Sequence, residues 1–206
     1  MRSAAIKSGM PRVLRSLVRA SAILLLAHIA TPAALGFGKQ IVVSVPDQEL
    51  ALIARGKTVA RYPVSTSKFG IGDGVGSYRT PLGTLYVSGK VGDGLPAGAV
   101  IKSRIPTGEV LAPNAPGRDP IVSRVLWLRG KEEQNRNARE RCIYIHGTAE
   151  ERRIGRRASY GCIRMKSKDV IALYSTVHIG TPVVISNKPL ADFLPAEEET
   201  LLERPY

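Results

Sequence analysis

The sequence predicts a mostly β domain with one or two helices. The chain combines 20 glycines and 14 prolines with 44% apolar residues, and only 5% of its residues are aromatic. Short apolar runs alternate with these turn-forming residues, as expected for strands joined by loops. The apolar fraction is large enough for a hydrophobic core, which excludes a disordered protein by composition.

Eight short runs predict strands. They cover residues 41–45, 49–54, 58–65, 84–88, 99–104, 121–128, 142–146 and 182–186. The clearest helix is expected over 167–177, where Ser167 can cap the first turn and Asp169 suits its positive end. The apolar stripe of this helix comprises Val170, Leu173, Tyr174 and Val177. The predicted domain spans about 40–187, and residues 188–206 are expected to form a peripheral C-terminal tail.

Residues 1–38 have the pattern of a secretory signal peptide. Five Lys and Arg residues, with no acidic residue among them, precede an uncharged apolar run over 20–35, and small residues that suit cleavage follow at Gly36 and Gly38. The run is short for a membrane span, and an uncleaved N-terminal anchor is the alternative. We therefore expect export to the periplasm or cell envelope, with membrane attachment only if the signal is retained.

The charge of the chain bears on its partners. The net charge is +13, and +8 remains once residues 1–38 are removed. An exported protein rarely meets nucleic acid, so the excess favours anionic envelope polymers or lipid headgroups instead. Part of it lies in a basic loop with Arg152, Arg153, Arg156 and Arg157. This loop either attracts acidic substrates or is simply solvated.

The two cysteines, Cys142 and Cys162, leave several kinds of chemistry open. A metal site needs three or four close ligands, but only His146 and His178 accompany the cysteines outside the signal segment, so no metal is expected. Export permits a disulfide. However, Cys142 lies four strand positions, about 13 Å, before His146, so Cys162 is not expected to contact both. Cys142 is then expected to be a small structural filler.

A nucleophile is the remaining alternative to a buried, inert thiol at Cys162. Gly161 permits a backbone turn that aims N–H groups at a developing oxyanion. His146 ends a predicted strand sixteen residues earlier, so a loop that folds back can bring imidazole and thiol together. Such a pair suits acyl transfer, because a neighbouring imidazolium lowers the thiol pKa and the thiolate attacks.

These residues carry a resemblance to a known family. "HGT" at 146–148, "SYGCIRM" at 159–165 and the segment 62–87 with its "TPLG" resemble the motifs of the L,D-transpeptidase catalytic domain, also called the YkuD domain. The resemblance covers about 40–187. It implies a β-sandwich of mixed sheets built around a Cys–His pair, and no cofactor is expected.

The resemblance implies roles for the catalytic residues. Cys162 would be the nucleophile, and His146 the general base and acid. The backbone carbonyl of Gly147 would hold the imidazole in its working tautomer, as an aspartate does in a protease triad.

The turn around the nucleophile is also assigned by the resemblance. Oxyanion donors would be the backbone N–H groups of Tyr160, Gly161 and Cys162, and Ser159 would shape the turn. Arg164 would brace the site or meet a substrate carboxylate. Many family members carry His or Arg where Tyr160 stands, so this side chain either lines the pocket and affects acceptor preference or is a packing aromatic.

The implied substrate is the peptidoglycan stem peptide. A thioester on Cys162 would pass to a second stem peptide, to a lysine of an envelope protein, or to water, which would make the enzyme a carboxypeptidase. The alternatives are a trimming hydrolase of the same fold and a non-catalytic wall-binding domain. Nucleic acid is not expected as a partner.

Overall fold

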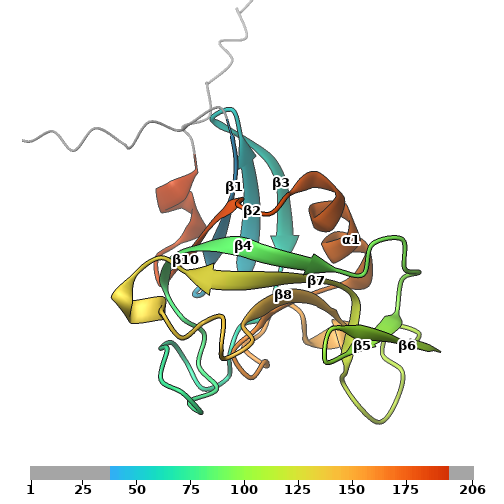
Figure 1. Cartoon of the computed structure of the whole chain (residues 1–206). Coiled ribbons are helices and arrows are strands. Elements are labelled where there is room, and N and C mark those ends of the chain that lie inside the picture. Colours follow the sequence, from blue (N-terminus) through green and yellow to red (C-terminus); the bar gives the residue numbers. More distant parts are fainter. Residues whose placement is uncertain (1–37, 195–206) are drawn as a thin grey trace, which may run out of the picture. The chain divides into compact units, whose positions relative to one another are not determined.

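The computed structural model describes residues 38–194, so the predicted signal segment up to Phe37 and the end of the predicted tail, 195–206, lie outside the described residues. The described chain contains ten strands, one α-helix and three short 3-10 helices (Figure 1). The prediction of a mostly β, mixed-sheet fold with one helix is confirmed. No helix within 38–194 is long and apolar enough to cross a membrane.

The bounds of the elements follow the chain order. The strands are β1 Lys39–Ser44, β2 Glu49–Ala54, β3 Lys57–Pro63, β4 Gly83–Val91, β5 Ala99–Lys102, β6 Ile105–Val110, β7 Ile121–Gly130, β8 Tyr144–Thr148, β9 Ile163–Met165 and β10 Pro182–Ser186. The helices are η1 Glu133–Asn135, η2 Glu151–Arg153, α1 Ser167–Thr176 and η3 Leu190–Phe193. The sequence predicts eight of these strands but neither β6 nor β9.

All ten strands belong to one mixed sheet. Its main path is β3-β2-β1-β10-β4-β7-β5-β6, and β8 pairs with β7 and β9. The pairs β1–β10 and β8–β9 are parallel, and the other described pairs are antiparallel. In Figure 1, β1–β3 run steeply across the direction of β4 and β7, so the sheet bends. The layers of the expected sandwich are thus joined into one sheet through β10.

The main core lies between the two parts of this bent sheet and α1. Ile41 from β1, Leu85 from β4 and Leu126 from β7 are fully buried in one cluster. The predicted stripe of α1 joins the same cluster, with Val170 and Leu173 fully buried. This packing anchors β7 and β8, which α1 contacts, and β8 carries His146.

The start of α1 differs from the prediction. Its N-cap residue is Lys166, and Ser167 is already inside the helix. The Ser167 N–H donates to a carboxylate oxygen of Glu151 at 2.8 Å, and its hydroxyl accepts a hydrogen bond from Ser123 at 2.9 Å. The predicted capping role of Ser167 is therefore wrong, because Glu151 from η2 supplies the acceptor.

Residues 188–194, which the sequence assigns to a peripheral tail, pack on the sheet. Leu190 of η3 is buried against Val42, Ala51 and Ile53 on the side of β1 and β2 away from the main core. The Leu190 N–H also donates to the Asp47 carboxylate at 2.6 Å. This part of the chain therefore belongs to the domain.

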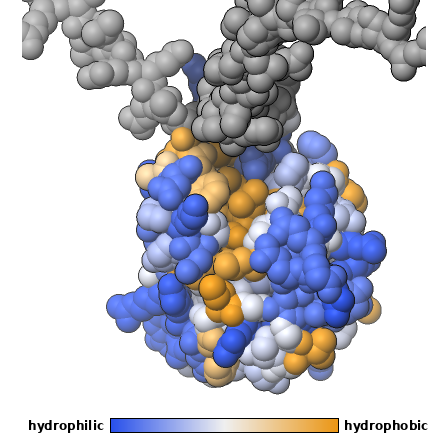
Figure 2. Space-filling model, turned by 90° about the vertical axis from the view of Figure 1, so that its left-hand side faces the viewer, coloured by the Kyte–Doolittle hydropathy of each residue, from blue (hydrophilic) through white to orange (hydrophobic). Residues whose placement is uncertain are grey.

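The surface is largely hydrophilic with local apolar areas. On the face shown in Figure 2, apolar residues gather in a band between charged and polar ones. The large apolar or aromatic residues that are exposed within 38–194 are Val59, Phe69, Val75, Tyr78, Ile105, Val110, Tyr160 and Ile179. Three of the aromatic residues contact one another and lie beside the candidate active site.

Candidate active site

Two adjacent parallel strands bring the predicted catalytic residues together. His146 lies in β8, where it is paired in register with Arg164 of β9, and Cys162 immediately precedes β9. The loop 149–162 between the strands folds back as predicted and includes η2. In register, Cys162 comes opposite Tyr144, two positions from His146.

The imidazole of His146 is buried and has a defined tautomer. Its Nδ1 lies 2.8 Å from the carbonyl oxygen of Gly147, so Nδ1 carries the proton and donates it, which leaves Nε2 as a proton acceptor. Burial lowers the pKa of His146 to about 4, although the Gly147 carbonyl and the charge of Asp119 act in the opposite direction. The imidazole is therefore neutral near pH 7 and its Nε2 can accept a proton, although the lowered pKa makes it a weaker base than an ordinary histidine.

The thiol of Cys162 lies against the beginning of β8. The Tyr144 N–H donates to Sγ at 3.4 Å, and the thiol donates to the carbonyl oxygen of Cys142, also at 3.4 Å. Burial raises the pKa of Cys162 to about 11, and the hydrogen bond from Tyr144 only partly offsets this. The expectation that an imidazolium lowers the thiol pKa fails here, because His146 is itself buried and neutral.

No hydrogen bond joins the thiol to the imidazole within the part of the chain that the structure describes. Catalytic hydrogen bonds are often long before substrate binds. The thiol therefore has to leave the Cys142 carbonyl before it can transfer its proton to His146.

The position of Cys142 corrects one expectation. The strand begins at Tyr144, and Cys142 lies in the preceding turn with a positive φ of 56°. Since the backbone there is not extended, the 13 Å spacing assumed for a continuous strand does not apply, and Sγ of Cys162 reaches the Cys142 carbonyl. Both cysteines are free thiols.

The turn before Cys162 is held by the Ser159 hydroxyl. This oxygen accepts the Gly161 N–H at 3.2 Å and donates to the Cys162 carbonyl at 2.6 Å, while the Thr80 hydroxyl donates to the Gly161 carbonyl at 3.0 Å. Gly161 has a φ of +118°, a conformation that favours glycine. The N–H groups of Tyr160 and Cys162 make no hydrogen bond to another residue of 38–194, so two of the three predicted oxyanion donors are available.

Arg164 braces the strands from within the domain. Its buried guanidinium pairs closely with Asp119 and lies 3.6 Å from Glu150, and Asp119 also accepts a close hydrogen bond from Thr148. Nε and Nη2 of Arg164 are buried without a partner in the described part of the chain. The sequence does not predict Asp119, because a single acid before a proline carries no signal beyond that of a turn.

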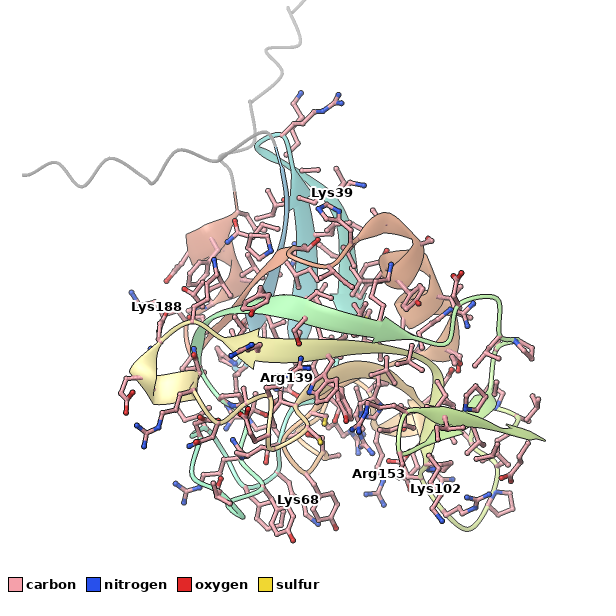
Figure 3. All side chains as sticks on the ribbon, in the orientation of Figure 1. Lys39, Lys68, Lys102, Arg139, Arg153 and Lys188 are labelled. Atoms are coloured by element: carbon pink, nitrogen blue, oxygen red, sulfur yellow. The ribbon has the colours of Figure 1, made fainter. Side chains whose placement is uncertain are left out.

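Tyr160 lies outside the core. Its side chain is exposed, its ring contacts Phe69 and Tyr78, and its hydroxyl accepts a hydrogen bond from Lys68 at 3.0 Å. Figure 3 shows Lys68 in the lower part of the domain, and Arg153 of the basic loop lies in the same lower part. Lys39 lies at the opposite end. The sequence does not predict this aromatic cluster, because Tyr160 is far along the chain from Phe69 and Tyr78.

No group of three His, Cys, Asp or Glu side chains suited to a metal ion occurs among residues 38–194. The residues that converge on the site are instead those of a thiol, an imidazole and a hydrogen-bonded turn. This set can support nucleophilic attack on a carbonyl.

Comparison with known proteins identifies the family. The family model for the L,D-transpeptidase catalytic domain, YkuD, matches residues 38–185. Two Bacillus subtilis (strain 168) proteins are similar: "Putative L,D-transpeptidase YqjB" is 29% identical over 71% of this chain and 70% of its own length. "Putative L,D-transpeptidase YkuD" is 28% identical over 71% of this chain and 65% of its own.

Solved structures of the same description are more distant. An L,D-transpeptidase from Mycobacterium smegmatis aligns over 72% of this chain and 59% of its own, with 19% identity and a TM-score of 0.45. An L,D-transpeptidase from Xylanimonas cellulosilytica aligns over 72% of this chain and 60% of its own, with 19% identity and a TM-score of 0.48. The chain thus spans about three fifths of these structures. Since the family model matches most of this chain, the protein belongs to the YkuD family of L,D-transpeptidase catalytic domains.

Proposed function

We propose that this protein is an exported L,D-transpeptidase that acts on peptidoglycan stem peptides through a thioester on Cys162. The observation that carries the proposal is the hydrogen bond from His146 Nδ1 to the Gly147 carbonyl, on a strand beside the one that Cys162 immediately precedes. It leaves Nε2 unprotonated, as a general base for the thiol requires.

Acylation begins from a neutral pair. Because burial favours the uncharged forms of both His146 and Cys162, the thiol proton moves to Nε2 as sulfur attacks the carbonyl of the third stem residue. The N–H groups of Tyr160 and Cys162 stabilise the oxyanion. The C–N bond to the terminal D-alanine then breaks, His146 returns the proton to the leaving amine, and a thioester remains.

Deacylation transfers the acyl group to an amine. A second stem peptide, or a lysine of an envelope protein, attacks the thioester with His146 as base, and Cys162 is released as a thiol. Attack by water would give a trimmed tripeptide. The exposed arginines of the basic loop, such as Arg152 and Arg156, favour approach of the acidic stem peptide.

The product profile on a defined tetrapeptide tests the proposal. The purified protein should release D-alanine and form dimers joined through third residues, and mass spectrometry should detect an acyl group on Cys162. Cys162→Ala should abolish both signals, whereas Cys142→Ala is the matched control that keeps them.

Other outcomes would contradict specific parts. Tripeptide without dimers would identify a hydrolase and refute transfer. Unchanged activity in folded Cys162→Ala would refute the nucleophile. Binding to cell-wall material without any turnover by the folded wild type would indicate a non-catalytic domain.

A further inference from the structure

We propose that Lys68, Phe69, Tyr78 and Tyr160 form a saccharide-binding platform beside Cys162. The ligand would be a sugar ring of the glycan strand to which the stem peptide is attached. The choice of this glycan rests on the proposed function, while the aromatic surface itself is a feature of the structure.

The three rings contact one another at interplanar angles of 40°, 54° and 88°, and all three are exposed. Phe69, Tyr78 and Tyr160 are 45%, 56% and 60% exposed. Their centroids are 5.9 Å apart for Phe69–Tyr78, 5.6 Å for Phe69–Tyr160 and 5.9 Å for Tyr78–Tyr160. Single exposed aromatic side chains are ordinary, but a contiguous exposed group next to a candidate active site indicates a binding surface.

The platform is built by tertiary contacts and not by a loose loop. The Ser67 hydroxyl donates to the Tyr78 carbonyl at 2.5 Å, and the Lys68 N–H donates to the Ser159 carbonyl at 3.1 Å. Tyr78 has a φ of +57°, which is costly for a bulky residue and is retained where the surroundings impose it. The platform is therefore fixed to the same turn that precedes Cys162.

The chemistry of the surface favours a sugar over an acyl chain. Aromatic faces carry negative charge density, so they accept the C–H face of a pyranose ring. Polar groups surround the rings: the hydroxyls of Tyr78 and Tyr160, and the Lys68 ammonium, which lies 4.4 Å from the Tyr160 centroid and 5.1 Å from that of Phe69. These groups can hydrogen-bond to sugar hydroxyl and acetamido oxygens, which an alkyl chain lacks.

The distance to the thiol suits this ligand. Tyr160 is two residues before Cys162, so their Cα atoms are at most about 7 Å apart. Three extended peptide residues span about 10 Å. A third-residue carbonyl at Cys162 therefore leaves the sugar end of the same stem peptide near the rings.

Direct binding of a peptide-free glycan tests the proposal without any catalysis. Cys162→Ala protein is titrated with an N-acetylglucosamine tetrasaccharide and followed by calorimetry and NMR. We expect saturable binding that Phe69→Ala and Tyr78→Ala each weaken at least fivefold. Val75→Ala is the control, since Val75 is 82% exposed in the same loop but outside the platform. No binding, or equal binding by all variants, would overturn the proposal.

A kinetic comparison gives a second readout. The ratio of kcat/KM for a disaccharide-linked tetrapeptide to that for the free tetrapeptide should exceed one and should fall at least fivefold in Phe69→Ala. An unchanged ratio would refute a glycan contact. If Tyr78→Ala does not fold, Phe69→Ala still decides the question. Failure of turnover in wild type would contradict the proposed function alone, because glycan binding is measured without the thiol.

Discussion

Mild acid should destabilise this protein through His146. The imidazole is buried and its pKa is lowered to about 4 by that burial, compared with 6.5 for an ordinary histidine. As pH falls below 6.5, the unfolded chain takes up a proton that the folded protein refuses until about pH 4. The stability present above pH 6.5 is therefore lost progressively over this window. At about 1.4 kcal/mol for each pH unit, the loss is ~3 kcal/mol.

Urea unfolding between pH 7.5 and pH 4 measures this effect. Wild type is compared with His146→Gln, in which a neutral side chain cannot take up the proton. The carboxylates titrate in both proteins, so the difference between the two curves isolates the imidazole. Wild type should lose ~3 kcal/mol more than the variant, and His178→Gln, which removes an exposed histidine, is the matched control.

Equal pH dependence in wild type and His146→Gln would refute the reasoning. It would mean that the folded protein holds the imidazole as a cation as readily as the unfolded chain does. The premise that burial keeps His146 neutral in the folded protein would then be wrong.

Three further predictions concern the same region. Asp119→Asn should lower the pKa of His146 further, because it removes a negative charge that favours the imidazolium. NMR titration of the ring measures this pKa, and a rise would contradict the prediction. Asp73→Ala should lower the free energy of unfolding by ~3 kcal/mol, measured with urea. In the wild type the Asp73 carboxylate lies 2.8 Å from the buried Arg141 guanidinium, which the substitution leaves without its ionic partner. A decrease below about 1 kcal/mol would contradict this prediction. Alkylation of Cys162 by iodoacetamide should accelerate about tenfold for each pH unit from 7 to 10, because its pKa is about 11. Peptide mapping distinguishes alkylation of Cys162 from that of Cys142. A rate that levels off near neutral pH would contradict a buried, neutral thiol at Cys162.

The fold was predictable where local pattern and tertiary structure agree. The strands β2 and β10 have the predicted bounds because their apolar residues are flanked by turn residues. The strand β6 is exposed along its whole length and contains Pro106 and Gly108, so it has neither the apolar pattern nor the composition of a strand. Its pairing with β5 alone makes it a strand, and no local signal reports that pairing.

The candidate site was predictable only as far as its motifs extend. Cys162 and His146 stand in recognisable segments, and the Gly147 carbonyl has the predicted neighbour. The rise in the pKa of the Cys162 thiol was not predictable, because it depends on burial that only the assembled sheet creates. Asp119 likewise becomes part of the site only through a turn far from it in sequence.

The place of β10 in the sheet has a consequence for biosynthesis. Of the strands within residues 38–194 it is the last to leave the ribosome, yet it lies between β1 and β4 and pairs with both. Until residues 182–186 are available, the first three strands can form local hairpins but cannot dock onto the part that carries the thiol. Contacts that join the two ends of a chain form late in folding. Translation must therefore pass residues 182–186 before the domain closes, and a ribosome stalled before Pro182 would hold a chain whose first three strands are not yet joined to the rest of the sheet.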